Sequence, residues 1–162
     1  MNFKEAFLNE LDHESKTTRK FIERVPLNHL DYKPHAKSMA LGKLATHIVE
    51  IVSYWDQVLQ RNELNFASKL PIQNDTLENL LRTYDYFIEL AKSAIQNFDE
   101  DKFLNPCDAK MGDTVFFTMP IYNICRITIM NHWIHHRAQL GIYFRQLDIA
   151  VPGAYGPSAD EG

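Results

Sequence analysis

Two long segments of this chain have apolar residues spaced three and four apart, and histidine interrupts both series. In the first segment, His47 stands between Leu44 and Ile51. In the second, His132 and His136 occupy positions at which core leucines would be expected. This spacing predicts helices that turn one face toward a core. Because buried imidazoles without partners are costly, the fold has to supply hydrogen bonds or a metal ion at these faces.

The two histidines of the second segment lie on one face of the predicted helix. His132 and His136 are four residues apart, so they stack about one turn from each other. Two imidazoles at this spacing can bind one divalent metal ion, as in metalloprotease helices. Together with His47 they suggest a three-histidine site, and core histidines satisfied by hydrogen bonds are the alternative. Zincin proteases have the motif H-E-x-x-H, in which glutamate follows the first histidine. Here Trp133 follows His132, so zincin-type proteolysis is poorly supported.

The periodicity predicts an all-α fold. Proline ends the first predicted helix and begins the fourth, whereas Ser38 and Asp75 are the predicted caps of the second and third. Segments of this kind need one another to bury their apolar faces, which predicts a single four-helix bundle over residues 1–162. The predicted helices lie at about residues 3–25, 38–60, 77–98 and 120–147.

Two segments outside these helices are predicted to be non-helical. The helical period is lost between residues 103 and 118, and the turn residues 111–114 predict a small irregular or hairpin insertion before the fourth helix. The C-terminal tail from Val151 to Ser158 is too rich in glycine and proline for a helix. We expect an extended tail that packs back on the helices through Tyr155.

Composition excludes several classes of partner. The chain has 162 residues and a formal net charge of −4. No basic stretch offsets this charge, which argues against a nucleic-acid partner. No apolar run reaches the length of a membrane span, and two cysteines do not form a disulfide framework. We therefore expect a cytoplasmic protein that acts on a small-molecule substrate without a nucleic-acid or membrane partner, and a homodimer remains open.

Two charged or titratable neighbours of the histidines are ambiguous. His135 is rotated about 100° from His136 on a helix, which favours an outer or surface position over a ligand. Glu50 follows His47 by nearly one turn and is the weak candidate for a catalytic residue, as a general base or as a group that orients the imidazole. Its interpretation as an exposed helix glutamate is slightly favoured, so the catalytic residues stay unknown.

Other chemically capable residues have simpler interpretations. Cys125 lies two turns from His132, too far to share a metal, and is read as small core packing. Cys107 is predicted in a loop, and nothing in the sequence lowers the pKa of its thiol. Arg137 and Gln139 flank the site and either contact a substrate or are solvated. The histidines outside both series are expected on the surface: His13, His29 and His35.

Several of these motifs resemble those of the DinB-like (damage-inducible) family. The resemblance rests on residues 41–47, on the tail at 152–161 and on the signature H-x-x-H-H-R-x-Q-L within 131–140. Residues 31–35 also resemble that family's first helix crossing. The resemblance implies an up-down-down-up arrangement of four helices and a metal held by His47, His132 and His136. The family commonly has glycine where this chain has Ala138, a change that removes no ligand.

The resemblance also directs the functional interpretation. Relatives in the broader superfamily include thiol-dependent S-transferases and an isomerase. Three neutral imidazoles leave a coordination position open, as in catalytic zinc sites, and Zn²⁺ or Ni²⁺ suits such ligands. We expect a metal-dependent transferase that uses a low-molecular-weight thiol as cosubstrate, or a hydrolase acting on a small substrate. A non-catalytic metal-binding or stress-response protein is the alternative.

Overall fold

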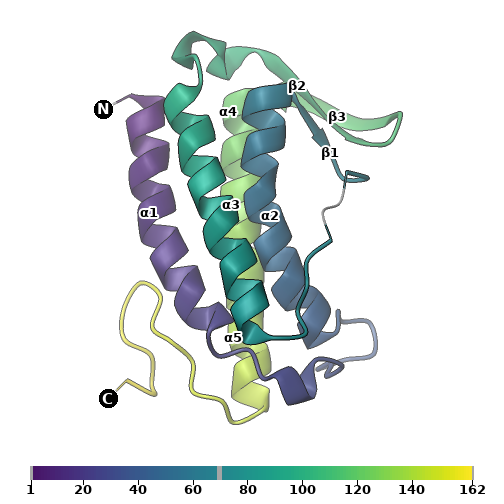
Figure 1. The fold of residues 1–162 in the computed structure, drawn as a ribbon, viewed down its shortest axis with the longest axis vertical. Helices are drawn as coiled ribbons and strands as arrows, with labels where there is room; N and C mark the ends of the chain where they lie inside the picture. Colours follow the sequence, from purple (N-terminus) through teal and green to yellow (C-terminus); the bar gives the residue numbers. More distant parts are fainter. Residues whose placement is uncertain (1, 69–70, 162) are drawn as a thin grey trace.

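Four long helical segments lie side by side in the computed structural model, which describes residues 2–68 and 71–161. The first and last segments run in one direction, whereas the second and third run in the other (Figure 1). The final segment is continuous, but its helical geometry changes from α to π and back to α along its length. The helices are α1 (Phe3–Ile22), α2 (Leu41–Arg61), α3 (Leu77–Asn97) and the run of α4 (Ile121–Asn123), η3 (Ile124–Asn131) and α5 (His132–Gln146).

The ends of α2 and α3 differ from the predicted caps. Ala40, not Ser38, precedes α2, and no side chain caps this helix. Instead the backbone of the preceding crossing accepts from its first amides, with Leu41 N donating to the Tyr32 carbonyl oxygen at 2.9 Å. At α3 the cap is Thr76 rather than Asp75, because the Thr76 side chain accepts from the amide of Asn79. A threonine hydroxyl is also a favoured N-cap acceptor for the free helix amides, although aspartate ranks above it.

A three-stranded mixed sheet shows that the prediction of an all-α fold is wrong. The strands are β1 (Glu63–Asn65), β2 (Pro106–Met111) and β3 (Thr114–Pro120), in the order β1-β2-β3. β2 and β3 form an antiparallel hairpin at the predicted insertion, although β3 continues to Pro120, where the fourth helix was predicted to begin. Gly112 at its turn has φ of +59°, a conformation that glycine adopts without strain. β1 adds in parallel to β2, pairing Leu64 with Ala109. Strand formation here depends on pairing between distant segments.

The helical segment that carries two of the histidines contains an unexpected π-helical stretch between α4 and α5. Residues 124–131 form η3, which continues without a break into α5 at His132. A π-helix has a wider turn than the 3.6 residues assumed in the sequence pattern, and such stretches often occur at functional sites. Cys125 and Ile129 in this stretch are nevertheless buried, so the apolar face is kept.

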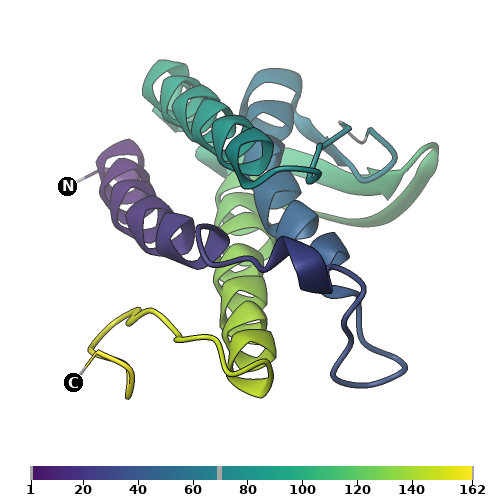
Figure 2. The ribbon, with the colours of Figure 1, turned by 60° about the horizontal axis from the view of Figure 1, so that its bottom comes forward.

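The C-terminal tail packs back on the helices, as predicted. Its Tyr155 hydroxyl accepts a hydrogen bond from Arg137 Nη2 and donates one to Glu14 Oε1, each at 2.9 Å. Arg145 and Asp160 add an ion pair at 2.8 Å. The tail therefore extends along α1 and α5 at the lower end in Figure 1, where the turned view of Figure 2 brings it forward. Within the described residues, no helix is both long and apolar enough to cross a membrane.

Candidate metal centre

Three predicted ligands come together where α2 packs against the start of α5. His47 lies near the beginning of α2, and His132 and His136 occupy the first and second turns of α5. Their available ligand atoms all lie within 4.8 Å of one another. The Nε2 atoms of His132 and His136 are 2.8 Å apart, and the ring centroid of His47 lies 5.2 Å and 4.8 Å from theirs. The structure thus confirms that these side chains cluster, whereas metal binding stays a prediction.

The spacing of the cluster fits a divalent metal ion. Two nitrogens at about 2.0–2.1 Å from one zinc ion lie roughly 2.9–3.4 Å apart, depending on the angle between the bonds. The observed 2.8 Å between two Nε2 atoms needs only a small adjustment to reach this range. Imidazole nitrogens are ligands that both Zn²⁺ and Ni²⁺ accept. The three histidines can therefore hold a metal ion.

Each of two histidines is oriented by a side chain three residues further along its own helix. Glu50 Oε2 lies 2.9 Å from His47 Nδ1, and Gln139 Oε1 lies 2.7 Å from His136 Nδ1. An acceptor at Nδ1 holds the proton there, which leaves Nε2 as the ligand atom and raises its basicity. The favoured interpretation of Glu50 as an exposed glutamate is wrong, since its side chain is only 13% exposed and contacts His47.

Burial keeps two of these imidazoles in the neutral form that binds metals. Desolvation is the main cause that lowers the pKa of His132, and the nearby His47 lowers it further. For His136 desolvation lowers the pKa to about 4, although the hydrogen bond with Gln139 acts in the opposite direction. At neutral pH, protons therefore compete weakly for these two ligands.

We predict that Glu50→Gln weakens metal binding about 10–100-fold, the usual effect of losing a group that orients a ligand. The amide can still accept a hydrogen bond but carries no charge to strengthen the imidazole as a donor. Competition with a chromogenic chelator measures the affinity. Glu78→Gln, on the exposed first turn of α3, is the control. Equal affinities for both variants would show that the Glu50 carboxylate contributes nothing.

The other candidate residues fall outside the cluster. His135 is exposed and, with its ring centroid 5.1 Å from that of His136, does not join the three-histidine group. Arg137 is neither solvated nor at the site, because it is buried against Glu14. Cys125 is buried, as predicted. Cys107 lies in β2 rather than in a loop, and burial, with Asp108 and Glu63 nearby, raises its thiol pKa to about 11. The three remaining histidines are exposed, as predicted: His13, His29 and His35.

A cavity of about 400 Å³ opens beside the cluster, and we call it the His136 cavity. The crossing before α2 forms one wall and α5 forms the other, so residues distant in sequence face each other across it. Sequence patterns alone had left this crossing without a role. The lining residues are Lys37, Ser38, Met39, His136, Gln139, Ile142 and Tyr143.

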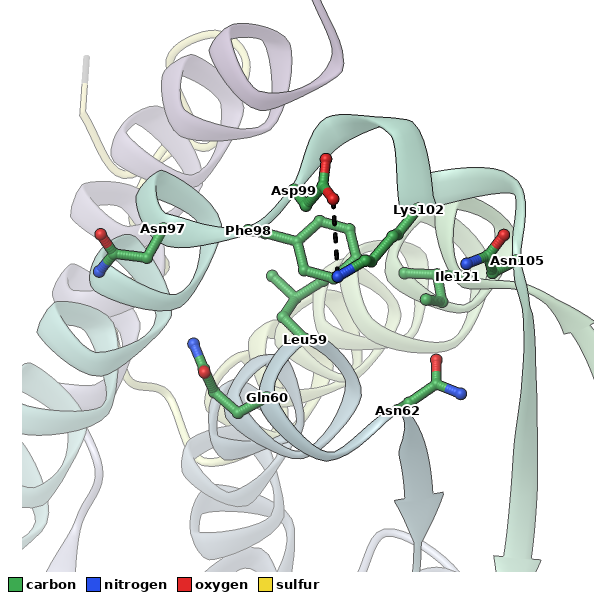
Figure 3. Close-up of a pocket in the computed structure, with 9 residues that line it drawn as sticks. All are labelled: Leu59, Gln60, Asn62, Asn97, Phe98, Asp99, Lys102, Asn105 and Ile121. Carbon is green, nitrogen blue, oxygen red and sulfur yellow. Dashed lines mark ion pairs between the residues drawn. The ribbon is translucent and has the colours of Figure 1, made fainter.

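A second hollow of about 370 Å³ lies at the opposite end of α2, where that helix and α3 approach the insertion (Figure 3). Its walls carry carboxamide side chains and the 3.5 Å ion pair between Lys102 and Asp99. No histidine or cysteine lines it. Of these two cavities, the His136 cavity is the one that a clustered histidine lines.

Comparison with known proteins agrees with this architecture. Over 163 residues the chain is 22% identical to the uncharacterized protein YrdA of Bacillus subtilis, covering 96% of this chain and 89% of YrdA. A DinB-like protein from Bacillus cereus has a similar fold, with a TM-score of 0.72, 22% identity and coverage of 93% and 97% of the two chains.

A second solved structure also has a similar fold. The DinB-like protein YjoA of Bacillus subtilis has a TM-score of 0.71 and 18% identity, with 92% of this chain and 96% of YjoA covered. The family model described as DinB family matches residues 1–162, the whole chain. With the helices, the histidine cluster and this match taken together, the chain belongs to the DinB family.

Proposed function

We propose that this protein is a metal-dependent enzyme that transfers a small thiol, with His47, His132 and His136 as the metal ligands. The observation that carries the proposal is the convergence of three imidazoles beside a cavity that one of them lines. Among the described residues, no fourth histidine, cysteine, aspartate or glutamate joins this group. A three-ligand set next to a cavity is typical of catalytic rather than structural sites.

The roles of the side chains follow from their positions. A divalent cation held by the three imidazoles would supply positive charge that favours the thiolate form of a bound thiol. Glu50 and Gln139 keep the ligand nitrogens directed at one point. Glu50, 13% exposed and 2.9 Å from His47, is also the carboxylate that can accept a proton at the site. Hydrolysis of a small substrate is the competing reaction for the same arrangement.

A screen of metal-loaded protein tests this function directly. Low-molecular-weight thiols are paired with small electrophiles, and hydrolysable esters and amides are assayed in parallel. We expect metal-dependent conjugation that is lost in His47→Ala and reduced in Glu50→Gln. Turnover that persists after the metal is removed would refute the mechanism. Absence of any reaction would favour the non-catalytic metal-binding alternative.

Metal binding is expected to stabilise the fold, because a ligand that binds only the native state adds about 2.7 kcal/mol at a hundredfold excess over its Kd. Chelation should therefore lower the melting temperature at pH 7. The difference between loaded and stripped protein should shrink as the pH falls toward about 4, where His136 becomes protonated and cannot ligate; burial lowers the pKa of His132 in the same direction.

Thermal unfolding of both forms at each pH measures this difference. Taking the difference removes the contribution of carboxylates that titrate equally in the two forms. The direction follows from linkage, because a proton bound to a ligand nitrogen of the stripped folded protein has to leave before the metal binds. A stabilisation that is the same at pH 4 and pH 7 would rule out neutral imidazole ligands.

A further inference from the structure

Three of the residues that line the His136 cavity carry hydrogen-bond donor groups. Lys37 has an ammonium group, Ser38 a hydroxyl and Gln139 a carboxamide NH₂. The Gln139 oxygen is already engaged by His136 Nδ1 at 2.7 Å, so its NH₂ group is the part left for another partner. Lys37 forms no ion pair within the part of the chain that the structure describes. The lining contains no aspartate or glutamate, so donors and positive charge dominate its polar part.

The wall that carries Lys37 and Ser38 is held against α5. The Tyr143 hydroxyl, whose residue is only 6% exposed, donates to the Met39 carbonyl oxygen at 2.9 Å. Tyr32, earlier in the same crossing, donates from its hydroxyl to Gln146 Oε1 at 2.9 Å and packs edge-on against the Tyr143 ring. These contacts join the two walls, so the backbone that carries Lys37 and Ser38 is fixed against α5 before any ligand binds, while the Lys37 side chain itself is exposed.

We infer that the His136 cavity binds the carboxylate of a small ligand whose other end reaches the three histidines. A carboxylate accepts charge-assisted hydrogen bonds, which match the ammonium, hydroxyl and carboxamide donors. The apolar parts of Met39, Ile142 and Tyr143 suit a short aliphatic chain between the two ends. This inference rests on the proposed function, because the cavity is assigned to the carboxylate of the thiol substrate. The protein should then bind thiols that carry a carboxylate in preference to neutral thiols.

Two thiols of the same size test the assignment. Cobalt(II)-loaded protein is titrated with 3-mercaptopropionate and with 3-mercaptopropionamide, and visible absorption reports thiol binding at the metal. We expect the acid to bind about tenfold more tightly than the amide in the wild type. Lys37→Met should remove this preference and Lys37→Arg should keep it. Lys33→Met, an exposed lysine of the same crossing outside the cavity lining, is the control.

A thiol-free titration separates this inference from the proposed function. Butyrate, but not butyramide, is expected to shift the NMR signal of the Gln139 NH₂ group in zinc-loaded protein, and Lys37→Met should abolish the shift. If butyrate gives this Lys37-dependent shift while neither thiol changes the cobalt spectrum, the thiol chemistry is wrong and the carboxylate site stands. Equal binding of both thiols without a butyrate shift would overturn the carboxylate site and leave the metal function standing.

Discussion

His132→Ala is expected to abolish stoichiometric metal binding while most of the helix content remains. The variant leaves two imidazoles, His47 and His136, where three converge within 4.8 Å. Loss of a ligand should reduce affinity by more than the about 10–100-fold expected for an orienting residue. Metal analysis after gel filtration measures the first outcome, and far-ultraviolet circular dichroism measures the second. Any thiol transfer or hydrolysis should disappear with the metal.

The neighbouring histidine provides the matched control for this experiment. His135 belongs to the same helix and the same signature, but it is exposed and outside the cluster. His135→Ala should therefore retain one metal ion per chain and full activity. If His132→Ala also retained a full equivalent of metal, the assigned ligand set would be wrong. If both variants lost the metal, His135 would have to be counted among the ligands.

Glu14→Ala is expected to destabilise the fold by about 3–5 kcal/mol, because it leaves the Arg137 guanidinium buried without its counter-ion. The two side chains are 5% and 2% exposed, and Arg137 Nη1 donates to the Glu14 carboxylate. Thr18 and Tyr155 complete the network, with hydrogen bonds to Arg137 of 3.2 Å and 2.9 Å. For a domain of this size the melting temperature should fall by roughly 6–20 °C.

Urea unfolding and thermal melts measure the loss in Glu14→Ala. Asp12→Ala removes an exposed ion pair on the same helix, in which Lys16 and Asp12 are 72% and 49% exposed, and should cost far less stability than Glu14→Ala. Because Glu14 does not belong to the histidine cluster, the variant should still bind metal below its melting temperature. Equal destabilisation by the two substitutions would show that burial adds nothing to the Glu14–Arg137 pair.

Glu50 and Gln139 orient two of the clustered histidines, but the sequence pattern indicated only Glu50 as a weak candidate for this role. Each follows a clustered histidine by three residues, at the spacing that brings side chains together on one helix face. The repeated spacing at His47 and His136 was a signal for orienting partners. Exposure could not be read in the same way, because a glutamate on a helix is solvated unless a neighbouring element covers it.

The sheet was missed for a different reason. β1 has only three residues, too few to show an alternating pattern, and it forms because Leu64 pairs with Ala109 on β2, far along the chain. By contrast, the hairpin turn at Gly112 is local, and its residues were recognisable in the sequence. A turn that depends on adjacent residues could therefore be predicted from the sequence, whereas the pairing of a strand with a distant segment could not.

The sequence by itself determined the long helical segments and the histidines that share their inward faces, because helical periodicity depends only on nearby residues. Tertiary structure decided the rest. Packing of α2 against α5 brought His47 to His132 and His136, and contact of α1 with α5 turned Arg137 from a candidate site residue into a buried partner of Glu14. The His136 cavity likewise exists only where Lys37 and Gln139 face each other, since such contacts depend on how distant segments pack.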